Sequence, residues 1–365
     1  MKKLTRRPTR FDGLTLGLDV HKKVIQWCLL DRNGDELAND QIEPTRKAVR
    51  WLIRRLQRQG AVQASLEATG CYLWIHDLLV ELLGGAHVHV AAPSRVRVIA
   101  ESSSKSDETD AWWLAYLLFE GRLPEAFTAE GDLRELRIAC RELRSVTDER
   151  SDLMRRLKSH LAQVGLNFSS SDWQSAVGWQ RIGKLVESVT EGVRRQAIER
   201  LWQRIQSLTE EQAYWSDQVR ELSGRFEEVA LIEQEIPGFG EILSPIIWAE
   251  LGDPRRYTSA KAFAKATGIT PGHRISAGRR QNKKITREGS AHVRWALTRA
   301  VTSCLHCTKR QAGVIIGNWV RARFQRQSKT RAIVAAARKL AEAIWRLFTL
   351  GEAFDVTRAF GGRAA

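Results

Sequence analysis

The order of strand-like and helix-like patterns in the first hundred residues most restricts how this chain can fold. Two β-rich runs surround a polar turn in residues 14–30, and a third strand is expected to end near Ile42. Helical and strand patterns then alternate, with a helix expected at 45–60, a strand at 62–67, a helix at 72–85 and a strand at 87–92. The predicted order is three strands, helix, strand, helix, strand, helix.

Short signals support the individual elements. Asn33 and Gly34 form a hairpin signal between the second and third strands. Thr45 is placed to cap the first helix, and four apolar residues share one face of that helix: Val49, Leu52, Ile53 and Leu56. Three antiparallel strands followed by alternating helices and strands describe an α/β sheet of ribonuclease-H type, which is the predicted fold of this region.

The composition favours a folded protein with a polyanionic partner. Lys and Arg number 58 against 42 Asp and Glu, which gives a formal net charge of +16, and 43% of the residues are hydrophobic. A basic excess spread along the chain is typical of nucleic-acid binding. No run is long enough to span a membrane, and no apolar signal core follows the basic N-terminus. Five scattered cysteines do not indicate a disulfide framework, so a cytoplasmic protein is expected.

Residues 132–235 change to long, charged, helical sequence with a break near residue 170. Apolar residues at helical spacing alternate with both signs of charge. Two antiparallel helices or a coiled-coil dimerisation arm fit this pattern. Self-association is expected because this stretch contains little else that could bury the apolar residues of its helices.

The last third combines a tight turn, a basic stretch and further helices. Ile236–Gly240 is expected to join two helices, and such turns can point backbone N–H groups at a phosphate. Residues 269–289 have no apolar periodicity and are predicted to form a loop. They carry one Glu and six basic residues: Arg274, Arg279, Arg280, Lys283, Lys284 and Arg287. Cys304 and Cys307 are interpreted as helix residues rather than as a metal or redox pair.

Four carboxylates are candidates for a metal site. They are Asp19 in the first strand, Glu67 at the end of the strand 62–67, and Asp107 and Asp110, which share one face of the following helix. Clustered carboxylates repel one another and raise each other's pKa values unless cations neutralise them. Mg²⁺ prefers such oxygen ligands, and two ions about 4 Å apart can assist phosphodiester chemistry. The strand order favours their convergence, whereas Asp12, Asp31, Glu101 and Glu108 are interpreted as ordinary solvated or capping acids.

Five motifs in this order resemble the DEDD transposases of bacterial insertion sequences: GLDVHKK, LEATGCY, KSDETDAWWLA, IPGFGEILSPIIWAELGD and the basic serine loop. This family includes the pilin-gene invertases and the bridge-RNA-guided recombinases. The resemblance extends over nearly the whole chain. It implies a RuvC-like metal-dependent domain at residues 1–128, a helical, coiled-coil oligomerisation arm at 129–235 and a mostly α-helical transposase domain at 236–365. It also implies that Asp19, Glu67, Asp107 and Asp110 bind Mg²⁺ or Mn²⁺.

The resemblance also singles out Ser276. Related transposases carry a nucleophilic serine in a loop of the kind PRxYxSGGK, and the matching stretch here is PGHRISAGRR. Alanine replaces the first glycine after the serine and arginine stands where lysine is frequent, but Gly278 and the positive charge remain. The six basic residues of the stretch are expected to bind nucleic acid, and His273 to contact phosphate. Ser244 and Ser290 are interpreted as helix-associated and Ser259 as a helix cap.

The implied activity is DNA recombination through a covalent phosphoserine, assisted by divalent metal. The resemblance implies target and donor duplex DNA as partners, a structured guide RNA, and homodimers that pair into a tetramer on DNA. The metal site and the serine would then meet within one chain or, as in related enzymes, across protomers. Two alternatives are a junction nuclease that uses water and does not need Ser276, and a binding protein with a decayed nuclease fold. The second is disfavoured because all four carboxylates remain.

Overall fold

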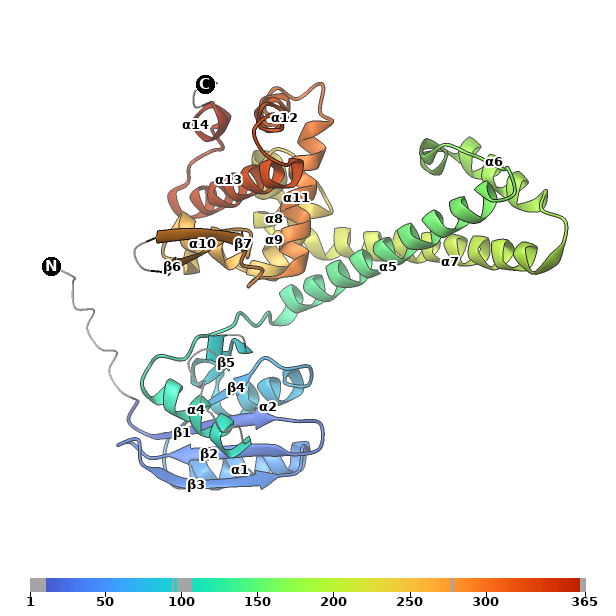
Figure 1. Ribbon diagram of the computed structural model, residues 1–365. Helices are drawn as coiled ribbons and strands as arrows, with labels where there is room; N and C mark the ends of the chain where they lie inside the picture. Colours follow the sequence, from blue (N-terminus) through green and yellow to red (C-terminus); the bar gives the residue numbers. More distant parts are fainter. Residues whose placement is uncertain (1–10, 94, 97–106, 277–278, 362–365) are drawn as a thin grey trace. The chain divides into compact units, whose positions relative to one another are not determined.

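A computed structural model describes residues 11–93, 95–96, 107–276 and 279–361 (Figure 1). Only the backbone is described for residues 273–276 and 279–283. The chain divides into two compact units, residues 1–128 and 129–365. Each unit is considered by itself.

The first unit is built on a five-stranded mixed sheet with the order β3-β2-β1-β4-β5. Its strands are β1 (Leu14–Val20), β2 (Ile25–Leu30), β3 (Glu36–Ile42), β4 (Val62–Glu67) and β5 (Val88–Ala91). The first three strands pair antiparallel, whereas β4 runs parallel to β1 and to β5. The expected order of strands and the mixed α/β character of this region are confirmed.

Helices cover both faces of this sheet. They are α1 (Arg46–Gln57), α2 (Leu73–Leu83) and α4 (Asp107–Phe119), with a short 3₁₀ turn η1 (Gly85–His87). Thr45 caps α1 as predicted, and its hydroxyl accepts a hydrogen bond from the Ala48 N–H. One face of the central strands packs on α1 and α2 in a single apolar cluster that includes Leu16, Leu18 and Ile53. The opposite face packs on α4.

The second unit is helical apart from one hairpin. Its helices are α5 (Gly131–Ala162), α6 (Ala176–Glu187), α7 (Gly192–Ser223), α8 (Glu227–Glu235), α9 (Leu243–Leu251), α10 (Ala260–Ala266), α11 (Ala291–Leu305), α12 (Gln311–Arg323), α13 (Lys329–Leu350) and α14 (Val356–Phe360). Two 3₁₀ turns are η2 (Ser170–Gln174) and η3 (Pro254–Arg256). In the described part of the chain, no helix combines the length and the apolarity that a membrane crossing needs.

Helices α5 and α7 lie side by side and run antiparallel, one of the two arrangements predicted for this stretch (Figure 1). Their contacts show the direction, because residue numbers fall along α5 as they rise along α7. The contacts are Glu149 with Arg204, Thr147 with Gln212, and Asp132 with Arg225.

The C-terminal part of α5 and the N-terminal part of α7 bury apolar residues against each other and against α6 within one chain. Leu157 and Leu161 of α5, Ile182 of α6, and Ile198 and Ile205 of α7 are each fully buried in one cluster. The rings of three tryptophans lie against its edge: Trp173, Trp179 and Trp202. Burial of these positions does not require a second copy of the chain, whereas other apolar side chains of the arm, such as those of Val177 and Val193, are exposed.

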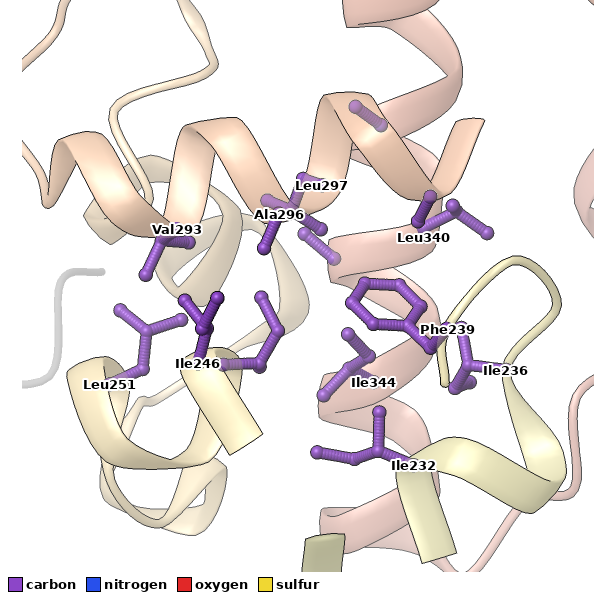
Figure 2. Close-up of a cluster of buried hydrophobic side chains, with 14 of the residues drawn as sticks. Ile232, Ile236, Phe239, Ile246, Leu251, Val293, Ala296, Leu297, Leu340 and Ile344 are labelled. Carbon is purple, nitrogen blue, oxygen red and sulfur yellow. The ribbon is translucent and has the colours of Figure 1, made fainter. Parts of the chain in front are cut away.

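The remaining helices surround the main core of the second unit. Figure 2 shows Ile232 of α8, Phe239 of the following turn, Leu297 of α11 and Ile344 of α13 gathered in this core. The turn Ile236–Gly240 joins α8 to α9 as predicted. Gly238 adopts a φ of +85°, and a Cβ there would lie 2.2 Å from the carbonyl oxygen of Ala300, so only glycine fits.

The basic stretch expected to be a loop is instead an antiparallel hairpin. Strands β6 (Pro271–Ser276) and β7 (Arg279–Ile285) pair with each other alone, and Ser276 is opposite Arg279. The prediction relied on apolar periodicity, which a strand needs only when one face is buried in a core. A two-residue spacing that includes glycine is a common hairpin connection. Those two residues, Ala277 and Gly278, lie outside the described residues.

The helix-associated serines have the structural roles that were expected, but only one of the two cysteines predicted to be helical is in a helix, because Cys307 follows the end of α11. Ser259 caps α10, Ser290 caps α11, and Ser244 is buried inside α9. Cys304 is buried in α11, and burial, with a smaller contribution from Cys307, raises the pKa of its thiol to about 12. A thiol that stays protonated is a poor nucleophile and a poor metal ligand.

Candidate metal centre and serine hairpin

Strand alternation presents two residues of β1 to α4, and the residue directly after the strand continues the same face. Successive side chains of a strand point to opposite faces, so Gly17, Asp19 and His21 share the face opposite Leu16 and Leu18. Gly17 lets α4 approach closely, because a Cβ there would lie 2.5 Å from the backbone nitrogen of Ala115. His21 follows the end of β1 and is fixed by its backbone N–H, which donates to the carbonyl oxygen of Val24 at 3.0 Å.

Asp19, His21 and Asp107 come together at this face. His21 Nε2 lies 2.8 Å from Asp19 Oδ2 and 3.6 Å from Asp107 Oδ1. One donor atom from each of the three residues lies within 4.8 Å of the others. The Asp19 side chain is only 7% exposed, whereas those of His21 and Asp107 are 48% and 53% exposed. The cluster therefore has a buried floor and an open side toward solvent.

Glu67 and Asp110 belong to the same region of the fold. Leu18 of β1 is paired with Leu66 of β4, so Asp19 and Glu67 are the next residues along two adjacent parallel strands. The Ser65 hydroxyl donates to the Leu114 carbonyl oxygen of α4 at 2.9 Å. By alternation, Glu67 lies on that same α4 face. Asp110 is one turn beyond Asp107 in α4.

Charge and burial act together on Asp19 and His21. Burial raises the pKa of Asp19, the hydrogen bond and charge of His21 oppose that rise, and the carboxylates of Asp110 and Asp107 add to it. Burial lowers the pKa of His21, but the hydrogen bond and charge of Asp19 and the charges of Asp107 and Asp110 outweigh it, so the net direction is upward. A buried carboxylate among other carboxylates is a favourable place for a cation.

A hydrogen-bonded chain connects the sheet to the first turn of α4. Gln26 of β2 lies opposite Asp19 and is almost fully buried. Its Nε2 donates to Asn39 Oδ1 at 2.7 Å, and Asn39 Nδ2 donates to the Glu108 carbonyl oxygen at 3.2 Å. Gln26 and Asn39 therefore help to fix the helix turn that carries Asp107.

Three residues of this region were not predicted from the sequence: His21, Gln26 and Asn39. For His21 a signal was available, because it follows Asp19 by two residues where a strand ends, and alternation puts both on one face. Gln26 and Asn39 gave no such signal, since their roles depend on cross-strand register.

Two family profiles match the chain. Residues 16–165 match one described as a transposase, of the DEDD IS110 type, and residues 231–314 match one described as the transposase IS116/IS110/IS902 family. The chain belongs to this transposase family. The first match spans β1 to α5, including all four carboxylates, and the second spans α8 to the start of α12, including the serine hairpin.

Several curated relatives of the family are similar to this chain. The transposase for insertion sequence element IS1111A of Coxiella burnetii is 22% identical over 96% of this chain and 93% of its own length. The putative transposase y4pF/y4sB of Sinorhizobium fredii is 33% identical over 33% of this chain. The IS1328 transposase of Yersinia enterocolitica is 28% identical over 33% of this chain. The chain spans 31% and 36% of the lengths of these last two relatives.

In this transposase, the backbone places Ser276 at the last residue of β6. Arg279 begins β7, and Arg280 is paired with Ile275. The side chains of His273, Arg274, Ser276, Arg279, Arg280 and Lys283 lie outside the described residues. Lys284 and Arg287 are described and exposed, so at least these two charges are open to a ligand in solution.

Proposed function

We propose that this transposase moves an insertion sequence by cutting and rejoining DNA through a covalent bond to Ser276, assisted by divalent metal at the four carboxylates. The observation that carries the proposal is the convergence of Asp19 and Asp107, which come from a strand and a helix distant in sequence. The strand order β3-β2-β1-β4-β5, with β3, β2 and β1 antiparallel and β4 and β5 parallel to β1, supports a RuvC-like fold for the first unit.

The donor set fits Mg²⁺ or Mn²⁺. Carboxylate oxygens are the ligands that Mg²⁺ prefers, and the open side of the cluster leaves room for water and a phosphate. Asp19, Glu67, Asp107 and Asp110 would hold the metal. When bound, it would polarise the scissile phosphate and neutralise charge that develops on its oxygens.

In this proposal Ser276 is the nucleophile. Its Oγ would bond to phosphorus as the bond from phosphorus to the sugar oxygen breaks, and a strand hydroxyl would later reverse the step. The phosphoserine conserves the phosphodiester energy, so rejoining needs no external energy source. Arg274, Arg279, Arg280, Lys283, Lys284 and Arg287 would bind the nucleic-acid backbone.

The proposed partners are target and donor duplex DNA, a structured RNA encoded by the element, and further copies of this chain. Base pairing by the RNA would select the DNA, and the excess of basic residues would contact backbones. We propose a homodimer that pairs into a tetramer on DNA, with the arm at 129–235 as the contact. Sedimentation should show at least a dimer for a fragment of residues 132–235, and a folded monomer would contradict that part.

A covalent-adduct assay tests the chemistry. A suicide substrate that cannot be rejoined should trap a protein–DNA adduct, and mass spectrometry should locate it in the peptide that contains Ser276. Ser276→Ala should lose both the adduct and recombination while still binding DNA. Ser259→Ala is the matched control, because Ser259 only caps α10 and its variant should still form the adduct.

The alternative is a metal-dependent junction nuclease that uses water. The carboxylate cluster supports it equally, because hydrolysis needs the metal but not the serine. If Ser276→Ala cleaves DNA as well as the wild type does, the nuclease is correct and the phosphoserine proposal is wrong.

A further inference from the structure

We infer that His21 is a ligand of the metal centre, so that the centre is formed by nitrogen as well as by carboxylate oxygens. This inference rests on the proposed function, since it concerns the same centre. It adds a residue outside the acidic tetrad. It also predicts that His21 increases the preference of the centre for Mn²⁺ over Mg²⁺, because Mg²⁺ takes hard oxygen ligands and gains less from a nitrogen ligand.

The spacing of donor atoms supports this role. Ligands about 2.1 Å from a metal and at right angles to each other are roughly 3 Å apart. His21 Nε2 and Asp19 Oδ2 are 2.8 Å apart, which is close to that value. His21 Nε2 and Asp107 Oδ1 are 3.6 Å apart, so a small rotation of the exposed Asp107 side chain would complete the set.

The backbone holds His21 where a ligand is needed. Its N–H bond to Val24 closes the turn between β1 and β2, so the residue cannot move far from the end of the strand. Asp19 is anchored inside β1, which is buried along its whole length. The backbones of both donor residues are therefore fixed, so metal binding requires little further loss of conformational freedom from them.

A simple ion pair between His21 and Asp19 is the competing explanation. An ion pair would leave nitrogen outside the coordination shell of the metal, whereas a ligand bonds to it directly. Pulsed electron paramagnetic resonance distinguishes the two, because a directly coordinated imidazole nitrogen gives a characteristic modulation of the Mn²⁺ signal.

The experiment uses the full chain with at most one equivalent of Mn²⁺. Wild type should show nitrogen modulation, and the pattern should change when histidine is labelled with ¹⁵N. His21→Gln keeps a polar side chain beside Asp19, and it should lose the modulation and bind Mn²⁺ about tenfold more weakly or worse. The loss of affinity for Mg²⁺, measured by competition, should be smaller.

His89→Gln is the matched control. His89 lies in β5 of the same unit, contacts Glu125 at 2.7 Å, and is not one of the three residues of the cluster. Its variant should keep both the modulation and the affinity. Circular dichroism shows whether each variant is folded, and the labelled wild type gives an answer even if His21→Gln does not fold.

The outcomes separate this inference from the proposed function. In one outcome, wild type binds Mn²⁺ without nitrogen modulation and Asp19→Asn loses the affinity. That result would overturn the role of His21 and leave the carboxylate centre intact. If wild type and Asp19→Asn bind Mn²⁺ equally weakly, the metal centre itself is wrong and the inference fails with it.

Discussion

Gly17 of β1 and Ala111 of α4 are in backbone contact, since a Cβ atom on Gly17 would lie 2.2 Å from the carbonyl oxygen of Ala111. This contact fixes how closely the helix that carries Asp107 and Asp110 approaches the strand that carries Asp19. The absence of a side chain at residue 17 is therefore a condition for the carboxylates to meet.

Gly17→Ala should destabilise the protein and weaken metal binding together. The added methyl group must displace α4 or β1, which typically costs about 1–3 kcal/mol in a packed core. Denaturant unfolding and Mn²⁺ titration measure the two effects. Gly60→Ala is the control, because nothing lies within 4 Å of a Cβ there and the substitution should be neutral or stabilising. Equal stability of the two variants would show that α4 is not held by this contact.

Asp19→Asn and Asp107→Asn should each reduce DNA cleavage by about a hundredfold or more, because each removes a charge that would stabilise the metal at the phosphate. Nucleic-acid affinity should hold or rise, since fewer negative charges repel the phosphates. Cleavage of nicked DNA in Mg²⁺ and a binding titration in EDTA give the two readouts. Normal cleavage by both variants would exclude the carboxylate metal site.

Without metal, the joint contribution of Asp19 and His21 to the free energy of unfolding should fall as the pH rises. The pKa of Asp19 is raised above its ordinary 3.8, so the folded state binds that proton more tightly and loses stability as the pH rises through the raised value. The pKa of His21 is raised above 6.5, so its contribution is present below 6.5 and is lost as the pH rises through the raised value. Both groups act in one direction.

Asp19→Asn should flatten this pH dependence and stabilise the metal-free protein at neutral pH. It removes one titrating group and the main partner that raises the pKa of the other. Urea unfolding in EDTA at several pH values is the measurement. A variant with the same slope as the wild type would mean that these two residues do not control the dependence.

Asn39→Ala should cost about 1–3 kcal/mol, because it leaves the buried amide of Gln26 without its acceptor. It should also weaken metal binding, since the first turn of α4 loses a hydrogen bond to the sheet. Gln41→Ala, at an exposed position of the same strand, is the control and should change neither quantity. A variant that loses stability but keeps full metal affinity would limit Asn39 to a structural role.

Arg141→Ala should destabilise the second unit by about 1–3 kcal/mol, because it removes the main partner of a buried carboxylate. Arg141 donates twice to Glu250, whose side chain is 3% exposed. Arg204→Ala removes an exposed partner of Glu149 and should cost about 0–1 kcal/mol. Thermal unfolding compares the two variants, and equal losses would show that burial of Glu250 does not matter.

The elements of the first unit could be predicted because their signals are local. Thr45 caps a helix whose apolar face is continuous, and Asn33 and Gly34 form the turn between β2 and β3, where Gly34 has a φ of +93°. The side-by-side position of Asp19 and Glu67 followed from strand order. The close approach of α4 at Gly17 could not be predicted, because a glycine in a strand does not indicate which helix packs against it.

The hairpin β6–β7 was missed for a different reason. Its strands pair with each other and with no larger sheet, so no alternation of apolar residues is needed to form it. Backbone hydrogen bonds between two strands do not depend on side-chain type, so they produce no recognisable pattern of residues. The basic stretch was therefore predicted to be a loop.

Strand β3 lies at one edge of the five-stranded sheet, and it is the only described strand of that sheet with several exposed residues. Its Glu36 and Asp40 are exposed acids. The unpaired backbone groups of an uncovered edge strand can pair with strands of other molecules, and charged side chains along the edge oppose such pairing. In the proposed assembly of several copies on DNA, local concentrations of the chain would be high, and an acidic edge would keep those copies from aggregating through their sheets.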